Sequence, residues 1–132
     1  MPVRYAIDLD QRVIRTRCIG ETTFGEVLAH FAELRSNPAL PQPLDVRLDF
    51  TEMTSVPRLD QIECVAETTA SLTPMLRWGA MAIVVNDSFA HNVSRIYEAL
   101  VKHYFQEVRI FRDSAEADAW LENMRGPGGA GR

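Results

Sequence analysis

Apolar and polar residues alternate in the first twenty positions of the chain. Every second residue from Val3 to Leu9 is apolar, and a second mixed, β-branched stretch runs from Val13 to Ile19. A period of two places one apolar row on a single face of a strand. Because the two stretches are separated only by a short polar segment, they predict an antiparallel hairpin. Its arginines are interleaved with acidic residues, which favours a solvated face of mixed charge over a basic stripe.

Four later stretches carry apolar residues at the 3.6-residue spacing of amphipathic helices. Thr23 and Glu26 fit a capping box at the start of the first, and Asn37-Pro38 ends it. The second is weakened by several threonines, and the third is the most strongly amphipathic. The predicted helices run from about Phe24 to Ser36, from Leu59 to Leu72 before Pro74, from Val93 to Tyr104 after the cap candidates Asp87 and Ser88, and from Ala117 to Met124 after Asp113 or Ser114.

Three more strands separate these helices. Residues alternate from Leu44 to Thr51, and a short apolar run spans Val108 to Phe111. The stretch from Trp78 to Val85 is apolar without alternation, which is typical of a strand covered on both faces, and we expect it in the middle of the sheet. The order ββαβαβαβα predicts an α/β fold with one five-stranded mixed sheet flanked by four helices. Residues 1–124 would form one domain, and 125–132, rich in glycine, a flexible tail.

Composition narrows the possible functions. The 132 residues carry a net charge of −4, which argues against nucleic acid as a partner. No apolar run is long enough for a spanning helix, and the first residues lack the layout of a signal peptide, so we expect a cytoplasmic protein with no membrane span. Cys18 and Cys64 lie outside metal-ligand spacings and are expected to be buried apolar residues. Since the common catalytic, cofactor and metal motifs are absent, the sequence predicts a non-enzyme without cofactor or metal.

Four segments carry a resemblance to a known family: LDVRLDFTEMTSV (Leu44 to Val56), RWGAMAIVVND (Arg77 to Asp87), FAHNVSRIYEAL (Phe89 to Leu100) and VRIFRDSAEADAWL (Val108 to Leu121). Together they resemble the STAS and SpoIIAA-like superfamily of small α/β domains. The resemblance covers about Val3 to Met124, and the ending is especially similar to an uncharacterised bacterial SpoIIAA-like group.

The resemblance implies a regulatory or protein-interaction domain, with a homodimer as a plausible resting state. Some members are anti-sigma-factor antagonists controlled by serine phosphorylation, in an Asp-Ser-Ser-Gly type motif that enters the second helix. In this chain Pro57 and Arg58 stand about where that Asp and Ser belong. Since proline cannot accept a phosphate, Ser55 is the remaining, imperfect candidate.

A ligand site is expected where the carboxyl ends of the parallel strands meet helix N-termini. Three loops reach that edge, and a small anionic or acyl ligand would lie near the start of the third helix. Its candidate residues are Asp87, Ser88, His91, Arg95 and Tyr97, with Glu52, Thr54, Asn92 and Arg112 nearby. These polar residues equally suit helix caps and solvated strand ends.

Apolar residues at loop boundaries offer a different kind of pocket: Met53, Trp78 and Phe89 could line an apolar cavity. The aromatic residues on the predicted helical stripes are mainly expected in the core; they are Phe24, Phe31, Phe89, Tyr97, Tyr104 and Trp120. Three hypotheses therefore stand: a non-enzymatic domain that binds a regulatory protein partner, a small-molecule or lipid carrier or sensor, and a phosphorylation-controlled antagonist.

Overall fold

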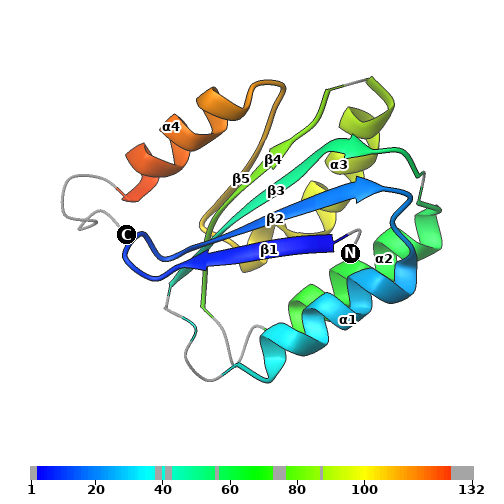
Figure 1. Cartoon of the computed structure of the whole chain (residues 1–132), viewed down its shortest axis with the longest axis horizontal. Helices are drawn as coiled ribbons and strands as arrows, with labels where there is room; N and C mark the ends of the chain where they lie inside the picture. Colours follow the sequence, from blue (N-terminus) through cyan, green and yellow to red (C-terminus); the bar gives the residue numbers. More distant parts are fainter. Residues whose placement is uncertain are drawn as a thin grey trace.

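One five-stranded sheet with four helices makes up the protein, as seen in a computed structural model (Figure 1). The structure describes residues 3–37, 40, 43–55, 57–72, 77–86 and 88–125. The strands are β1 (Val3–Asp8), β2 (Val13–Gly20), β3 (Leu44–Met53), β4 (Trp78–Val84) and β5 (Glu107–Phe111). The helices are α1 (Phe24–Arg35), α2 (Leu59–Ser71), α3 (Ser88–Val101) and α4 (Ser114–Arg125), and a 3-10 turn η1 (Lys102–Tyr104) follows α3.

The strands lie in sequence order across the sheet, β1-β2-β3-β4-β5. β1 and β2 pair antiparallel, with Val3 opposite Cys18, and every later neighbour is parallel. Arg12 closes the hairpin in the left-handed region, with φ 55. The predicted hairpin, the mixed sheet and the α/β class are therefore confirmed.

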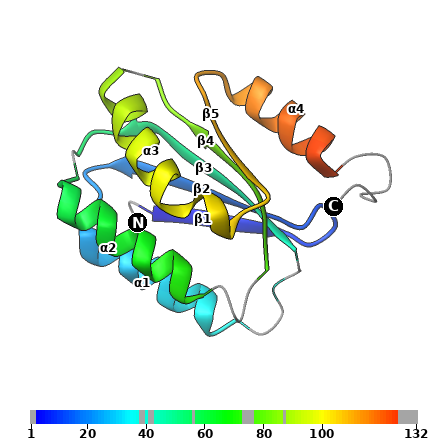
Figure 2. The same cartoon turned by 180° about the vertical axis from the view of Figure 1, so that it is seen from behind.

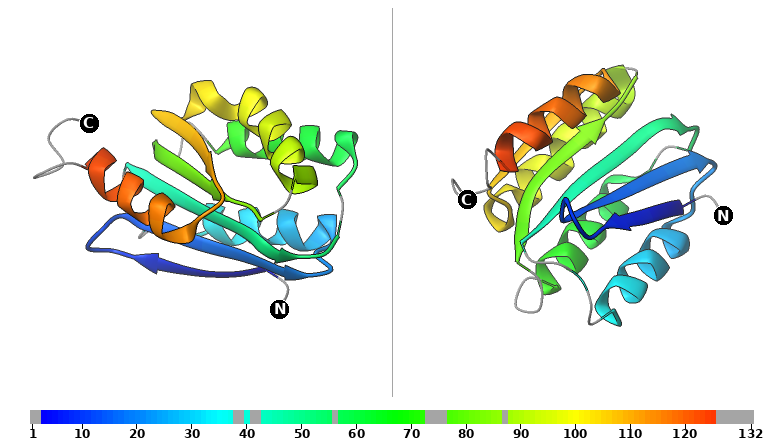
Figure 3. Two further views of the ribbon diagram at one scale, coloured as in Figure 1. Left: turned by 90° about the horizontal axis from the view of Figure 1, so that it is seen from above. Right: turned by 60° about the vertical axis from the view of Figure 1, so that its left-hand side comes forward.

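Three helices cover one face of the sheet and one covers the other. Figures 2 and 3 show α1, α2 and α3 side by side on one face and α4 alone on the opposite face. β4 lies between these layers, and all seven of its residues are buried, as its unbroken apolar run predicts. The expectation that it is the middle strand is wrong: β3 holds that position, because the chain adds each parallel strand on the same side of the last.

Local signals explain most helix boundaries. Thr23 forms the predicted capping box with Glu26. Of the two cap candidates for α4, Asp113 is the one that accepts a hydrogen bond, from the Ala115 N–H at 2.9 Å. α3 ends at Val101, and the predicted helical residues up to Tyr104 form the tighter η1 turn. α4 includes Arg125, one residue beyond the predicted domain end; the predicted tail from 126 onward and Asp87 lie outside the described residues.

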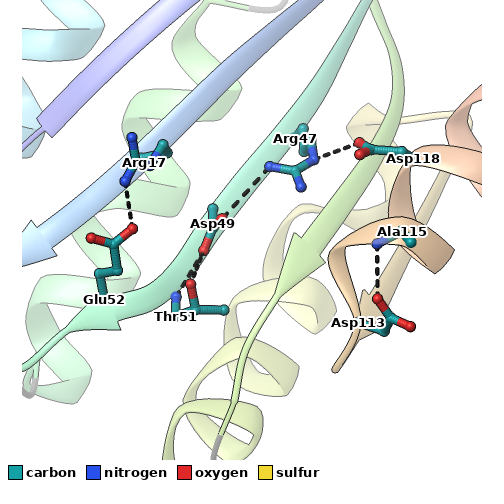
Figure 4. A network of polar contacts seen from close by, with 8 residues as sticks. All are labelled: Arg17, Arg47, Asp49, Thr51, Glu52, Asp113, Ala115 and Asp118. Atoms are coloured by element: carbon teal, nitrogen blue, oxygen red, sulfur yellow. Dashed lines mark hydrogen bonds and ion pairs between the residues drawn. The ribbon is translucent and has the colours of Figure 1, made fainter.

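The sheet face beside α4 is charged rather than apolar over β2 and β3 (Figure 4). Arg17 pairs with Glu52, and the Arg47 guanidinium lies 2.6 Å from Asp118 of α4 and 3.6 Å from Asp49. Alternation along the strands puts these residues on the face opposite α1 to α3. The face thus has the mixed charge that the sequence indicates.

Candidate functional site: a cavity between the sheet and three helices

A cavity of about 800 Å³ lies between the sheet and helices α1, α2 and α3. Protein interiors normally contain few voids larger than a water molecule, whereas cavities that hold small ligands measure roughly 300 to 1,000 Å³. A void of this size inside the main core therefore marks the best candidate for a binding site.

The walls of the cavity are predominantly apolar. Alternate residues of β3 face it, because odd-numbered and even-numbered positions of a strand point to opposite faces of the sheet. The helical stripes that the sequence predicts supply the facing wall. Representative lining residues are Val46, Leu48 and Phe50 from β3, Val27 and Phe31 from α1, Ile62 and Val65 from α2, and Val93 from α3.

Two loops meet at the end of the cavity that lies by the carboxyl ends of β2 and β3. The Ser55 hydroxyl accepts a hydrogen bond from the Thr22 N–H at 3.0 Å and donates one to the Thr22 carbonyl at 3.2 Å. Ser55 therefore ties the loop before α1 to the loop before α2. Arg58 lines the cavity at this end, and its guanidinium is paired with Asp60, 3.1 Å away, where both side chains are largely exposed.

The other end of the cavity is formed by two stacked aromatic rings. Trp78 and Phe105 stack with centroids 5.1 Å apart and an interplanar angle of 28°. Trp78 is the first residue of β4, and Phe105 follows the η1 turn. The cavity therefore runs along the strands, from the loops at their carboxyl ends to the aromatic pair at the start of β4.

Four polar atoms in lining residues lack a hydrogen-bond partner among the described residues: Thr22 Oγ1, His30 Nδ1, Trp78 Nε1 and Ser94 Oγ. All four are buried from solvent, and such orphan groups are rare in native proteins because each costs about 1 to 3 kcal/mol. Their residues line one cavity, so they offer hydrogen-bonding groups in an otherwise apolar wall.

A fifth polar position in the wall is already satisfied. The Thr69 hydroxyl lies 2.9 Å from both the Val65 carbonyl and the Tyr97 hydroxyl. A hydroxyl carries one proton, and the carbonyl can only accept, so Thr69 donates to Val65 and accepts from Tyr97. This bond joins α2 to α3 in the wall of the cavity that faces the sheet.

Three buried titratable groups in the wall are held in their neutral forms. Burial, with a smaller effect of the Asp49 charge, raises the pKa of the Cys18 thiol to about 11. Burial also raises the pKa of Tyr97 to about 12. The pKa of His30 is lowered by burial, which outweighs the nearby Glu33. The charged side chains among the described lining residues, Glu21 and Arg58, are both exposed, so the buried part of the wall is uncharged near neutral pH.

The structure separates the residues predicted for a ligand site. Tyr97 and Ser55 line the cavity, as Met53 and Trp78 do. His91 is half-buried and Arg95 is exposed on α3, and neither lines the cavity. Ser88 begins α3, while its side chain, that of Phe89 and the whole of Asp87 lie outside the description.

Sequence reasoning missed three of the orphan residues. Thr22 and Ser94 carry no local signal that separates them from an ordinary loop or helix hydroxyl. His30 is half-buried, its ring is 4.8 Å from the Tyr5 ring, and its Nε2 is 3.4 Å from the Thr16 hydroxyl. Only the tertiary structure shows that these residues face one void.

The described residues contain no group of three or more His, Cys, Asp or Glu side chains placed to hold a metal ion. Each helix in the same part of the chain is too short or too polar to cross a bilayer.

Comparison with solved structures supports the fold. The chain is similar to an uncharacterized protein from the DUF3478 family with a SpoIIAA-like fold, from Shewanella loihica PV-4. The TM-score is 0.63 at 16% sequence identity, and the match covers 91% of this chain and 92% of the other. This chain thus has a SpoIIAA-like fold, as its sequence resemblance implies. No protein-family model matches the sequence, and neither does any curated protein.

Proposed function

We propose that this protein is a non-enzymatic carrier or sensor that binds a small, largely apolar molecule inside the cavity beneath α1, α2 and α3. The observation that carries the proposal is the void of about 800 Å³ within the main core. The cavity is partly open to solvent, so its apolar lining meets water unless a molecule occupies it. A bound molecule would bury that lining and pack against it.

Two further features support a binding role. The wall supplies apolar contacts together with a few hydroxyl, imidazole and indole groups, the mixture that is typical of ligand cavities. In addition, the pKa of Cys18 is raised to about 11 and that of His30 is lowered, so both side chains stay uncharged. Uncharged walls suit the burial of a hydrocarbon skeleton.

The test is binding of a fluorescent fatty acid, cis-parinaric acid, to the purified protein, measured by fluorescence titration and native mass spectrometry. We expect saturable binding at one site and a rise in melting temperature with probe concentration. Val46→Phe, which places a phenyl ring in the cavity, should abolish binding. Leu121→Ala on α4, outside the cavity lining, is the control and should bind the probe normally once folded. Absence of binding in the wild type would refute the proposal.

The regulatory partner, the homodimer and the phosphorylation of Ser55 predicted from the sequence stay predictions. The structure gives the last of these a physical consequence. A phosphate on Ser55 would replace the hydroxyl that holds the Thr22 backbone, and so would release one loop at the cavity end. Phosphopeptide mass spectrometry after co-expression with candidate kinases tests this hypothesis.

A further inference from the structure

We infer that the bound molecule is an uncharged, oxygenated lipid, with hydrogen-bonding oxygen atoms within its buried part, rather than a molecule with a plain hydrocarbon tail. The inference rests on the proposed function and specifies its ligand. It is carried by the orphan polar atoms of the cavity wall, above all those of Ser94 and Trp78, which are 2% and 7% exposed.

Ser94 lacks the hydrogen bond that its position on a helix would normally provide. Serine and threonine within helices usually donate to the carbonyl four residues earlier. Thr68 and Thr69 on α2 do so, at 2.9 Å in both cases. The Ser94 hydroxyl makes no such bond among the described residues, although it is almost completely buried and lines the cavity. A ligand hydroxyl or carbonyl would satisfy it.

Trp78 requires an acceptor in particular. An indole N–H can only donate, so neither hydrocarbon nor another donor can satisfy it. Stacking on Phe105 fixes the ring at the end of the cavity. The ligand therefore places an oxygen atom at that end.

Ser94 and Trp78 lie at different points along the length of the cavity. Ser94 stands halfway along α3, and Trp78 stacks on Phe105, which follows the end of that helix. Half of a 14-residue helix is roughly 10 Å long. One polar group at a single end of a fatty acid could not reach both, so the buried skeleton carries at least two oxygen atoms.

The charge of the wall selects against a buried anion. Cys18, His30 and Tyr97 are held neutral by burial. The guanidinium of Arg58, at the loop end, is already paired with Asp60. A carboxylate deep in the cavity would therefore stay uncompensated, at a cost of several kcal/mol. The buried part of the ligand therefore carries no charge.

The experiment compares two uncharged probes of equal length, methyl stearate and methyl 12-hydroxystearate, as competitors of cis-parinaric acid. We expect the hydroxylated ester to bind about fivefold more tightly to the wild-type protein, since one buried hydrogen bond contributes about 1 kcal/mol. Ser94→Ala should remove most of this preference and leave the affinity for methyl stearate within about twofold. Ser71→Ala, at an exposed position of α2, is the matched control and should keep the preference.

A second measurement concerns stability without ligand. Because Ser94→Ala removes a buried hydroxyl that has no partner, it should not lower the melting temperature of the ligand-free protein. A marked decrease would mean that the hydroxyl is already bonded, and would overturn the inference. Equal binding of both esters would overturn it as well while leaving the proposed function standing. If neither ester nor the probe binds, the proposed function itself fails.

Discussion

The direction of the hydrogen bond between Tyr97 and Thr69 determines how mutation of either residue changes the free energy of unfolding. Thr69 donates its proton to Val65, so Tyr97 must donate to Thr69. Tyr97→Phe removes a donor together with its bond and should lower the free energy of unfolding by about 1 kcal/mol. Thr69→Val leaves the buried Tyr97 hydroxyl without an acceptor and should cost more, about 1 to 3 kcal/mol. Urea denaturation of both variants measures the difference.

The double variant provides the control for that prediction. With both polar partners gone, no orphan hydroxyl remains, so Thr69→Val combined with Tyr97→Phe should cost less than the sum of the single changes. If Tyr97→Phe proves more destabilising than Thr69→Val, the assigned direction of the hydrogen bond is wrong.

Cys18 makes stability depend on pH in the alkaline range. Its pKa is about 11 in the folded protein and close to 9.0 when the chain is unfolded. Stabilisation from the buried neutral thiol is therefore fully present below pH 9 and is lost as the pH rises towards 11. We expect Cys18→Ser to reduce the loss of unfolding free energy between pH 8 and pH 10.5 by about 1 to 2 kcal/mol.

Cys64→Ser serves as the matched change, because Cys64 is only partly buried on α2. It should retain the wild-type dependence of unfolding free energy on pH. An alkaline loss that Cys18→Ser leaves unaltered would show that burial of this thiol does not contribute.

At the scale of elements, α4 and the other helices use the sheet differently. Ala80 and Ala82 of β4 are fully buried and belong, with Ala117 and Leu121 of α4, to an apolar cluster separate from the main core. Small residues on both sides allow close approach of helix and strand, and Arg47 adds an ion pair with Asp118 at the edge. α4 is therefore packed directly onto its face, whereas α1, α2 and α3 enclose a void.

Leu121→Ala should separate stability from binding. Deleting a buried leucine side chain from a packed contact costs about 2 to 5 kcal/mol, so we expect a loss in that range by urea denaturation. The affinity of the folded variant for cis-parinaric acid should stay within about twofold of wild type, since α4 lies on the opposite face from the cavity. A tenfold loss of affinity would show that the two faces are coupled.

Sequence patterns predict elements well here and say less about what lies between them. The capping box at Thr23, the hairpin and the doubly covered β4 each depend on local spacing, which the chain carries explicitly. The threonines of α2 weaken its sequence signal, yet Thr68 and Thr69 are accommodated by donating to carbonyls within the helix.

The interior of the whole molecule could not be predicted in the same way. Apolar periodicity shows which side chains turn inward, but a filled core and a hollow one require the same periodicity. Val46 and Ile62 would be expected in the core in either case. Whether their side chains meet depends on the distance between α2 and the sheet, which no local pattern encodes. For this reason the sequence placed the ligand outside the strand ends, whereas the cavity continues beneath the helices.

That distinction gives opposite expectations for one substitution on the two faces of the sheet. Val46 and Val84 are both buried valines on neighbouring inner strands, but Val46 lines the cavity and Val84 packs beneath α4. Val84→Phe forces a ring into a filled contact and should lower the free energy of unfolding by about 1 to 3 kcal/mol or more. Val46→Phe directs the same ring into the cavity, where new contacts offset the strain, and should cost less than about 1 kcal/mol or stabilise the ligand-free protein. Thermal and urea denaturation of the delipidated variants compares them directly. Equal destabilisation by both changes would mean that the space above β3 is already filled in solution, and that no cavity is available for a ligand.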